Sequence, residues 1–103
     1  DDAGRVLGLH AYSVNDKHKN TLKTYFIVTG KAARGHGIAK LLIKNAIYKH
    51  KDKIAFYYVN SDVRSDGFSF FKKWLGENYE IVDNDFNSQD IIYKEPIYNV
   101  LDG

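Results

Sequence analysis

The sequence predicts a mixed α/β fold in a single domain, and three observations predict it. An apolar, β-rich run at residues 22–29 passes through a short basic turn with glycines into a segment with helical apolar spacing at residues 38–49. A second apolar run at residues 54–59 is followed by an aromatic, helix-like segment at residues 67–75. The chain of 103 residues is 44% hydrophobic and 15% aromatic, which suits one packed core.

Two strands are expected before the first helix. Apolar side chains in residues 5–14 indicate the first strand, which ends before the turn residues Asn15 and Asp16. The polar stretch 17–20 then leads into the second strand at residues 22–29.

The first helix is expected over residues 38–49. Ile38, Leu41, Leu42 and Ala46 repeat at helical spacing and form one apolar face. This face is wide, as expected for a helix that lies across a sheet.

The second half of the chain predicts a strand, a helix and a final hairpin. The run 54–59 is almost continuously apolar, which predicts burial on both faces and a central place in the sheet. The helix 67–75 ends before Gly76. The expected order is therefore β-β-α-β-α-β-β, with the last strands at residues 79–82 and 91–97 around a turn at 84–88.

The turn before the first helix indicates a phosphate site. The first N–H groups of a helix are unpaired, and the helix dipole favours negative charge there. Gly35 and Gly37 allow positive φ and close approach of a ligand, while Arg34 and Lys40 add positive charge. A dinucleotide fingerprint would need glycine in place of Lys40, and a Walker loop would need Lys-Ser/Thr in place of His36-Gly37, so both are excluded.

The pattern that remains is Arg-x-x-Gly-x-Ala, formed by Arg34, Gly37 and Ala39. Here the sequence resembles the GNAT superfamily of N-acetyltransferases, whose corresponding turn cradles the pyrophosphate of acetyl-coenzyme A (acetyl-CoA). Residues 54–60 resemble the next strand of that family, and residues 67–73 resemble its helix with a Phe-Tyr pair. The last two expected strands resemble its closing strand pair.

The resemblance implies a central mixed, mostly antiparallel sheet with splayed central strands and flanking helices, in one domain over residues 1–103. Family members usually carry a strand, two helices and a further strand before the point where this chain begins. We therefore expect an N-terminally short GNAT-like domain.

The resemblance also implies a cofactor site. Backbone groups of the strand before the turn would bind the pantetheine arm and polarise the thioester, and the turn with the first helical residues would bind the pyrophosphate. No metal is expected. The expected cofactor-binding residues are Ile27, Val28, Thr29, Arg34, Gly35, His36, Gly37, Ile38, Ala39, Lys40, Asn60 and Phe71.

Catalytic residues are harder to assign from the sequence. Phe71 stands where many GNAT enzymes place a tyrosine that protonates the departing thiolate, and phenylalanine has no proton to give. Tyr25 and Tyr58 are weak candidates, and for both an aromatic packing role is the better interpretation.

The leading hypothesis is an N-acetyltransferase that moves acetyl from acetyl-CoA to a primary amine by direct transfer in a ternary complex. The amine could belong to a small molecule or a protein. The alternative is a non-catalytic acyl-CoA-binding module or a subunit of a larger enzyme, which the phenylalanine at position 71 would suit.

Composition restricts the compartment and the partners that we expect for the protein. The chain has no cysteine, which excludes disulfides and a cysteine nucleophile and fits the cytoplasm. No apolar run approaches the roughly 20 residues that span a bilayer, so no membrane partner is expected. A net charge of +2, with mixed signs along the chain, does not favour nucleic acid. The late strands offer a way for two copies to pair as a homodimer.

Overall fold

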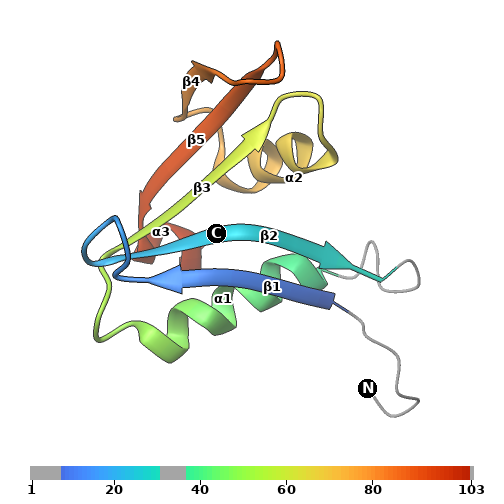
Figure 1. The fold of residues 1–103 in the computed structure, drawn as a ribbon. Helices are drawn as coiled ribbons and strands as arrows, with labels where there is room; N and C mark the ends of the chain where they lie inside the picture. The colour runs from blue at the N-terminus through green and yellow to red at the C-terminus, as the bar shows by residue number, and fades with distance from the viewer. Residues whose placement is uncertain (1–7, 31–36, 103) are drawn as a thin grey trace.

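The computed structural model describes residues 8–30 and 37–102, which form one sheet with three helices (Figure 1). The strands lie in the order β1-β2-β3-β5-β4, and all neighbours are antiparallel except β2 and β3. The predicted mixed, mostly antiparallel sheet is confirmed. In chain order the elements are β1 Gly8–Val14, β2 Thr21–Thr29, α1 Ile38–His50, β3 Phe56–Asp62, α2 Asp66–Leu75, β4 Glu80–Asp83, β5 Gln89–Pro96 and α3 Ile97–Asp102.

The expected elements are all present within the described residues, and α3 is an addition. The part of the first expected strand before Gly8 lies outside the described residues. Residues 97–102 are too short for a periodic signal, and the apolar run before them reads as strand. Val100 of α3 is fully buried, so packing against the core stabilises this short helix.

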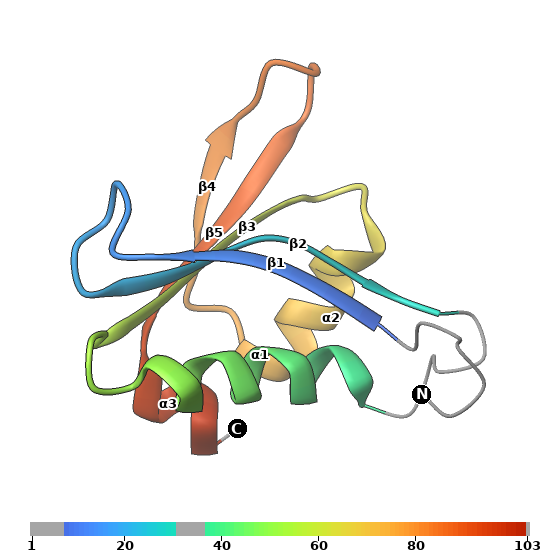
Figure 2. The same cartoon turned by 60° about the horizontal axis from the view of Figure 1, so that its bottom comes forward.

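All three helices pack on one face of the sheet (Figure 2). The core fills the space between that face and the helices, and aromatic residues of β3, β5 and α2 supply much of its volume. The buried apolar residues are Leu22, Ile43, Ala46, Ile47, Ile54, Tyr57, Val59, Phe71, Ile91, Tyr93 and Val100.

The opposite face of the sheet carries no helix among the described residues, and we call it the open face. In β3, Tyr57 and Val59 point into the core, whereas Phe56 is 37% exposed and Asn60 is exposed. The expected burial of this strand on both faces is therefore wrong, because alternate side chains point to the open face. Its expected central place in the sheet is confirmed.

A β-bulge lies in the middle of β2. Ala11 of β1 pairs with Phe26, but the next residue, Tyr12, pairs with Thr24. Tyr25 is thus the extra residue on β2, and a bulge of this kind bends its strand and increases the local twist.

The two central strands part at this bulge. Parallel pairing of β2 with β3 covers Thr21–Thr24 and Phe56–Val59 and goes no further. Beyond that point β2 stays paired with β1, while β3 stays paired with β5 as far as Asp62. The predicted splay of the central strands is confirmed, and it opens a gap in the sheet pairing between β2 and β3.

Candidate functional site

The start of α1 has the features of an anion-binding site. Gly37 occupies the N-cap position without a side-chain cap hydrogen bond, and the first turn holds no acidic residue. The first helical hydrogen bond runs from the Leu41 N–H to the Gly37 carbonyl at 3.0 Å. Hence the N–H groups of Ile38, Ala39 and Lys40 have no partner within the helix and can bind an anion.

Gly37 is required by the backbone geometry at this point. Its φ of 71° and ψ of 17° lie in the left-handed region. A Cβ placed there would meet no atom of residues 8–30 or 37–102 within 4 Å, so these residues leave the space beside the helix start open. Arg34, Gly35 and His36, the other turn residues of the expected cofactor site, lie outside the described residues.

Ile27, Val28 and Thr29 lie on β2 beyond the bulge. They pair with β1 along one edge of the strand, and the other edge faces the gap toward β3. Because N–H and C=O groups alternate in direction along a strand, part of this backbone is directed into the gap. A ligand with amide groups could pair there as an added strand would.

Asn60 and Phe71 lie on opposite sides of the sheet. Asn60 is exposed on the open face, and its Nδ2 donates to Asp90 Oδ2 at 3.2 Å. Phe71 is only 3% exposed and packs with the rings of Trp74 and Tyr93 in the core. These two expected cofactor residues are therefore not brought together by the fold.

Tyr25 and Tyr58 come together on the open face, where β2 and β3 begin to part. The Nζ of Lys23 lies 5.2 Å from the ring centroid of Tyr25 and 5.3 Å from that of Tyr58. The Tyr25 hydroxyl donates to Asp16 Oδ2 at 3.2 Å, and the ring of His18 stacks on Tyr58 at 4.6 Å. We call these five residues the aromatic cluster.

The electrostatic surroundings favour the protonated form of Tyr58. Burial raises its pKa, and the negative charges of Glu80 and Asp90 raise it further. The phenol is therefore neutral at physiological pH and could donate a proton, but it is poorly suited to accept one as a base.

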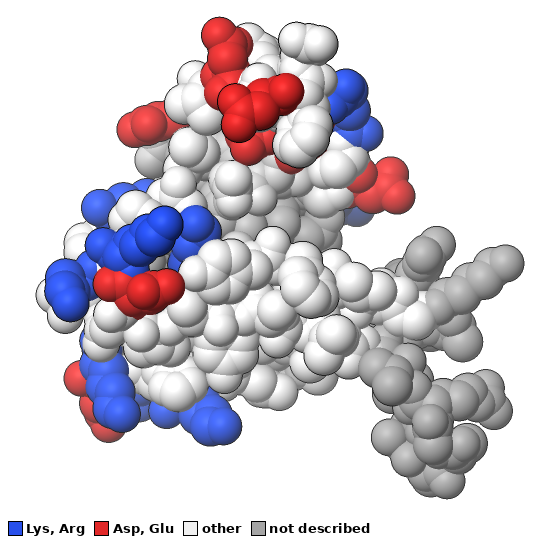
Figure 3. Space-filling model, viewed as in Figure 1, with Lys and Arg blue, Asp and Glu red and all other residues white. Residues whose placement is uncertain are grey.

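Opposite charges gather at opposite ends of the open face. Figure 3 shows Lys and Arg side chains around the β1–β2 turn, and acidic side chains at the end that carries β4 and β5. Residues 77–90 contain no lysine or arginine and hold the five acidic residues Glu77, Glu80, Asp83, Asp85 and Asp90. The β4–β5 side of the gap is therefore the negative side.

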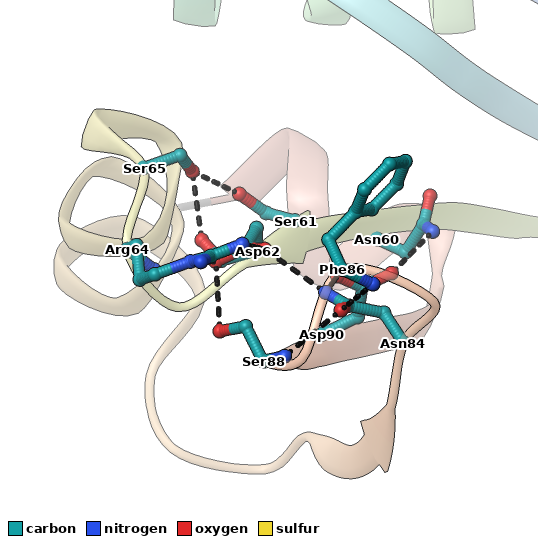
Figure 4. Close-up of polar contacts among 9 residues, drawn as sticks. All are labelled: Asn60, Ser61, Asp62, Arg64, Ser65, Asn84, Phe86, Ser88 and Asp90. Carbon is teal, nitrogen blue, oxygen red and sulfur yellow. Dashed lines mark hydrogen bonds and ion pairs between the residues drawn. The ribbon is translucent and has the colours of Figure 1, made fainter.

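A polar network fixes the end of β3 to the β4–β5 turn (Figure 4). The Asp62 carboxylate accepts from Arg64 Nη2 and from Asn84 Nδ2, each at 2.9 Å, and from Ser88 Oγ at 3.2 Å. Asn84 Nδ2 also donates to Asp90 Oδ1 at 2.9 Å. The hydrogen bonds from Arg64 are the main reason that the pKa of Asp62 lies well below its usual value.

Sequence reasoning missed a buried polar chain beneath the point of splay. His10 Nε2 lies 2.7 Å from Thr24 Oγ1, which lies 2.7 Å from the Tyr57 hydroxyl. Burial lowers the pKa of His10 and raises that of Tyr57. Each residue reads as an ordinary strand position, and only the pairing of three strands brings them together.

The described residues hold no group of three or more His, Cys, Asp or Glu side chains that could bind a metal ion. Within the same residues no helix has the length and apolar character needed to cross a bilayer.

The model of the acetyltransferase (GNAT) family matches residues 1–76. The chain belongs to the GNAT family. A comparison with curated protein sequences gives no match.

Solved GNAT structures share the fold at low sequence identity. A GNAT family acetyltransferase from Elizabethkingia anophelis with acetyl-CoA bound has a TM-score of 0.66 and 17% identity, over 89% of this chain and 69% of that chain. The ribosomal-protein-S18-alanine N-acetyltransferase from Escherichia coli has a TM-score of 0.64 and 14% identity, over 91% and 63%. A Bacillus subtilis acetyltransferase in complex with CoA has a TM-score of 0.64 and 14% identity, over 90% and 70%. The chain thus spans less than two thirds of the Escherichia coli enzyme.

Proposed function

We propose that this GNAT-family chain binds acetyl-CoA and transfers its acetyl group directly to a primary amine in a ternary complex. One observation carries the proposal. The unpaired edge of β2 beyond the bulge leads along the strand toward the uncapped start of α1. An extended ligand with amides at one end and a diphosphate at the other suits these two features together.

We assign different parts of acetyl-CoA to different groups of the expected cofactor residues. Backbone groups of Ile27, Val28 and Thr29 would bind the pantetheine arm, and the N–H groups of Gly37, Ile38, Ala39 and Lys40 would bind the diphosphate. Arg34, Gly35 and His36 complete this proposed turn. Two of the neighbouring structures named above were solved with acetyl-CoA or CoA bound.

Direct transfer requires only a modest set of groups. The neutral amine nitrogen attacks the thioester carbon, the C–S bond breaks, and the coenzyme leaves as a thiolate. The nitrogen loses one proton to solvent water, and the thiolate takes one up. Backbone N–H groups at the open edge of β2 would stabilise the oxyanion that forms. Holding both reactants together can lower the barrier by several kcal/mol, so a strong base in the site is not essential.

The aromatic cluster is the proposed source of a proton for the thiolate. Phe71 is buried and has no acidic group, whereas Tyr25 and Tyr58 lie on the open face at the point of splay. The raised pKa of Tyr58 keeps its phenol protonated, so that it has a proton to give. We assign the open face to the acceptor, and its amine would approach past the negative β4–β5 side.

A non-catalytic acyl-CoA-binding module is the second candidate function. The phenylalanine at position 71 favours it, because the side chain cannot act as the general acid found in many GNAT enzymes. In either function we expect the protein in the cytoplasm.

Release of free thiol from acetyl-CoA, measured with a panel of polyamines, amino-terminal peptides and lysine peptides, tests the proposal. We expect release that depends on both acetyl-CoA and an amine. Tight acetyl-CoA binding without release, across the panel, would favour the binding module. No binding of acetyl-CoA at all would overturn both functions.

A further inference from the structure

The chain contains one tryptophan, Trp74, which lies in the last turn of α2. The indole Nε1 is buried and has no hydrogen-bond partner among the described residues. Buried N–H donors are almost always paired, because an unpaired one has lost its hydrogen bonds to water without replacement. This orphan donor therefore requires an explanation.

The indole is placed beside the expected cofactor site. The Nζ of Lys40, in the first turn of α1, lies 5.4 Å from the centroid of the Trp74 ring. Phe70 and Phe71 hold the ring from α2, with centroids 5.6 Å and 6.4 Å away. Both helices lie beneath the sheet, on the same face (Figure 2). The ring of Trp74 on α2 thus lies beside the side chain of a residue in the first turn of α1, where the diphosphate is expected.

We propose that the Trp74 Nε1–H donates a hydrogen bond to an oxygen of bound acetyl-CoA, in the phosphopantetheine part of the molecule. That part offers amide carbonyl and phosphate oxygens, which are strong acceptors. Lys40 lies over the ring, and its long, flexible side chain is the neighbour that can move to admit the ligand. The inference rests on the proposed function and adds a side-chain donor from α2 to the backbone donors of β2 and α1.

The single tryptophan makes the contact observable without any assay of activity. We expect the emission of Trp74 to change when the wild-type protein is titrated with acetyl-CoA, with the same dissociation constant that calorimetry gives. Phosphopantetheine should produce the change at higher concentration. Adenosine 3′,5′-bisphosphate, which lacks the pantetheine arm, should leave the emission unchanged.

The variant Trp74→Phe keeps an aromatic ring and removes the donor. We expect its dissociation constant for acetyl-CoA to rise about three- to tenfold, the usual effect of losing one such hydrogen bond. The matched control is Phe70→Leu, which changes a neighbouring ring that has no hydrogen-bond donor. Without ligand, the melting temperature of Trp74→Phe should fall no more than that of Phe70→Leu. Phe70→Leu should bind acetyl-CoA with nearly unchanged affinity.

Three results would overturn the inference. One is wild-type binding of acetyl-CoA by calorimetry with no change in Trp74 emission. Another is that Trp74→Phe binds acetyl-CoA as tightly as the wild type does. The third is that Phe70→Leu loses as much affinity for acetyl-CoA as Trp74→Phe does, because the loss would then be due to packing. The proposed function survives all three, because it is tested separately, by binding of acetyl-CoA to the wild-type protein and by release of free thiol with the amine panel.

Discussion

Gly37 shows how one backbone conformation connects the fold with the proposed ligand. Its left-handed φ of 71° turns the chain into α1, and the described residues leave open space where a side chain would project. A left-handed conformation costs an ordinary L-residue roughly 1–2 kcal/mol, and asparagine tolerates it better than a β-branched residue does.

We therefore predict that Gly37→Val lowers the free energy of unfolding by about 1–2 kcal/mol and also weakens acetyl-CoA binding, because its side chain projects beside the helix start. Gly37→Asn should be less costly to the fold, and it serves as the control for backbone strain. Urea unfolding and calorimetry measure the two effects. Wild-type affinity in a folded Gly37→Val protein would show that the turn has only a structural role.

His10 shows how burial makes one residue sensitive to pH. Its ring lies between Tyr12, at 4.8 Å between centroids, and Thr24, which contacts Tyr57 in turn. In the folded state, burial lowers the pKa of His10 below the ordinary histidine value of 6.5. The unfolded chain therefore binds a proton at His10 more readily than the folded chain does.

The sign of the effect follows from that difference. Stability from a neutral His10 is fully present above about pH 6.5 and is lost as pH falls from there toward the folded pKa. We predict a lower urea midpoint at pH 5.5 than at pH 7.5, and a smaller decrease in His10→Gln, which cannot titrate. An identical decrease in both proteins would assign the pH dependence to other groups.

At the scale of elements, the splay depends on what holds β3 away from β2. The bulge at Tyr25 bends β2, which stays paired with β1, and the Asp62 network holds the end of β3 to the β4–β5 turn. Asn84 is central to that network. Its Nδ2 donates to Asp62 and Asp90, and its Oδ1 accepts from the N–H groups of Phe86 and Ser88.

We predict that Asn84→Ala lowers the free energy of unfolding by about 1–3 kcal/mol, because it removes several hydrogen bonds and leaves partly buried carboxylates with fewer donors. Thermal unfolding measures the change. Asn78→Ala, an exposed asparagine that precedes β4, is the matched control and should be nearly neutral. Equal effects of the two substitutions would show that the network contributes little.

At the scale of the whole molecule, the proposed ligand would contact β2, α1 and α2 at the same time. The start of α1, the open edge of β2 and the side chain of Trp74 come from separate parts of the chain. A ligand that binds only the folded protein stabilises it by mass action.

We predict that acetyl-CoA at a hundredfold excess over its dissociation constant raises the free energy of unfolding by about 2.7 kcal/mol. Adenosine should do far less, because it lacks both the diphosphate and the pantetheine arm. A thermal shift assay compares the two ligands. No shift with millimolar acetyl-CoA or CoA would contradict the proposed function.

Much of the architecture could be predicted from the sequence because it depends on local pattern. Helical spacing predicted residues 38–49, and α1 is Ile38–His50. Within that helix the apolar pattern predicted more burial than the structure has, and Leu41 is 53% exposed. The reason is that a wide apolar stripe does not show which part of it faces the sheet. Likewise the apolar run of β3 indicated a central strand but could not show that only one face is covered.

The sequence by itself determined the order of the elements from β1 to β5, the glycine turn before α1 and the family to which the chain belongs. The tertiary structure alone decided three further features: the bulge at Tyr25, the polar chain from His10 through Thr24 to Tyr57, and the meeting of Lys40 with Trp74. The physical reason is the range of the interactions. Periodicity and turn chemistry act over a few neighbouring residues, whereas register, splay and an unpaired buried donor depend on how distant segments pack.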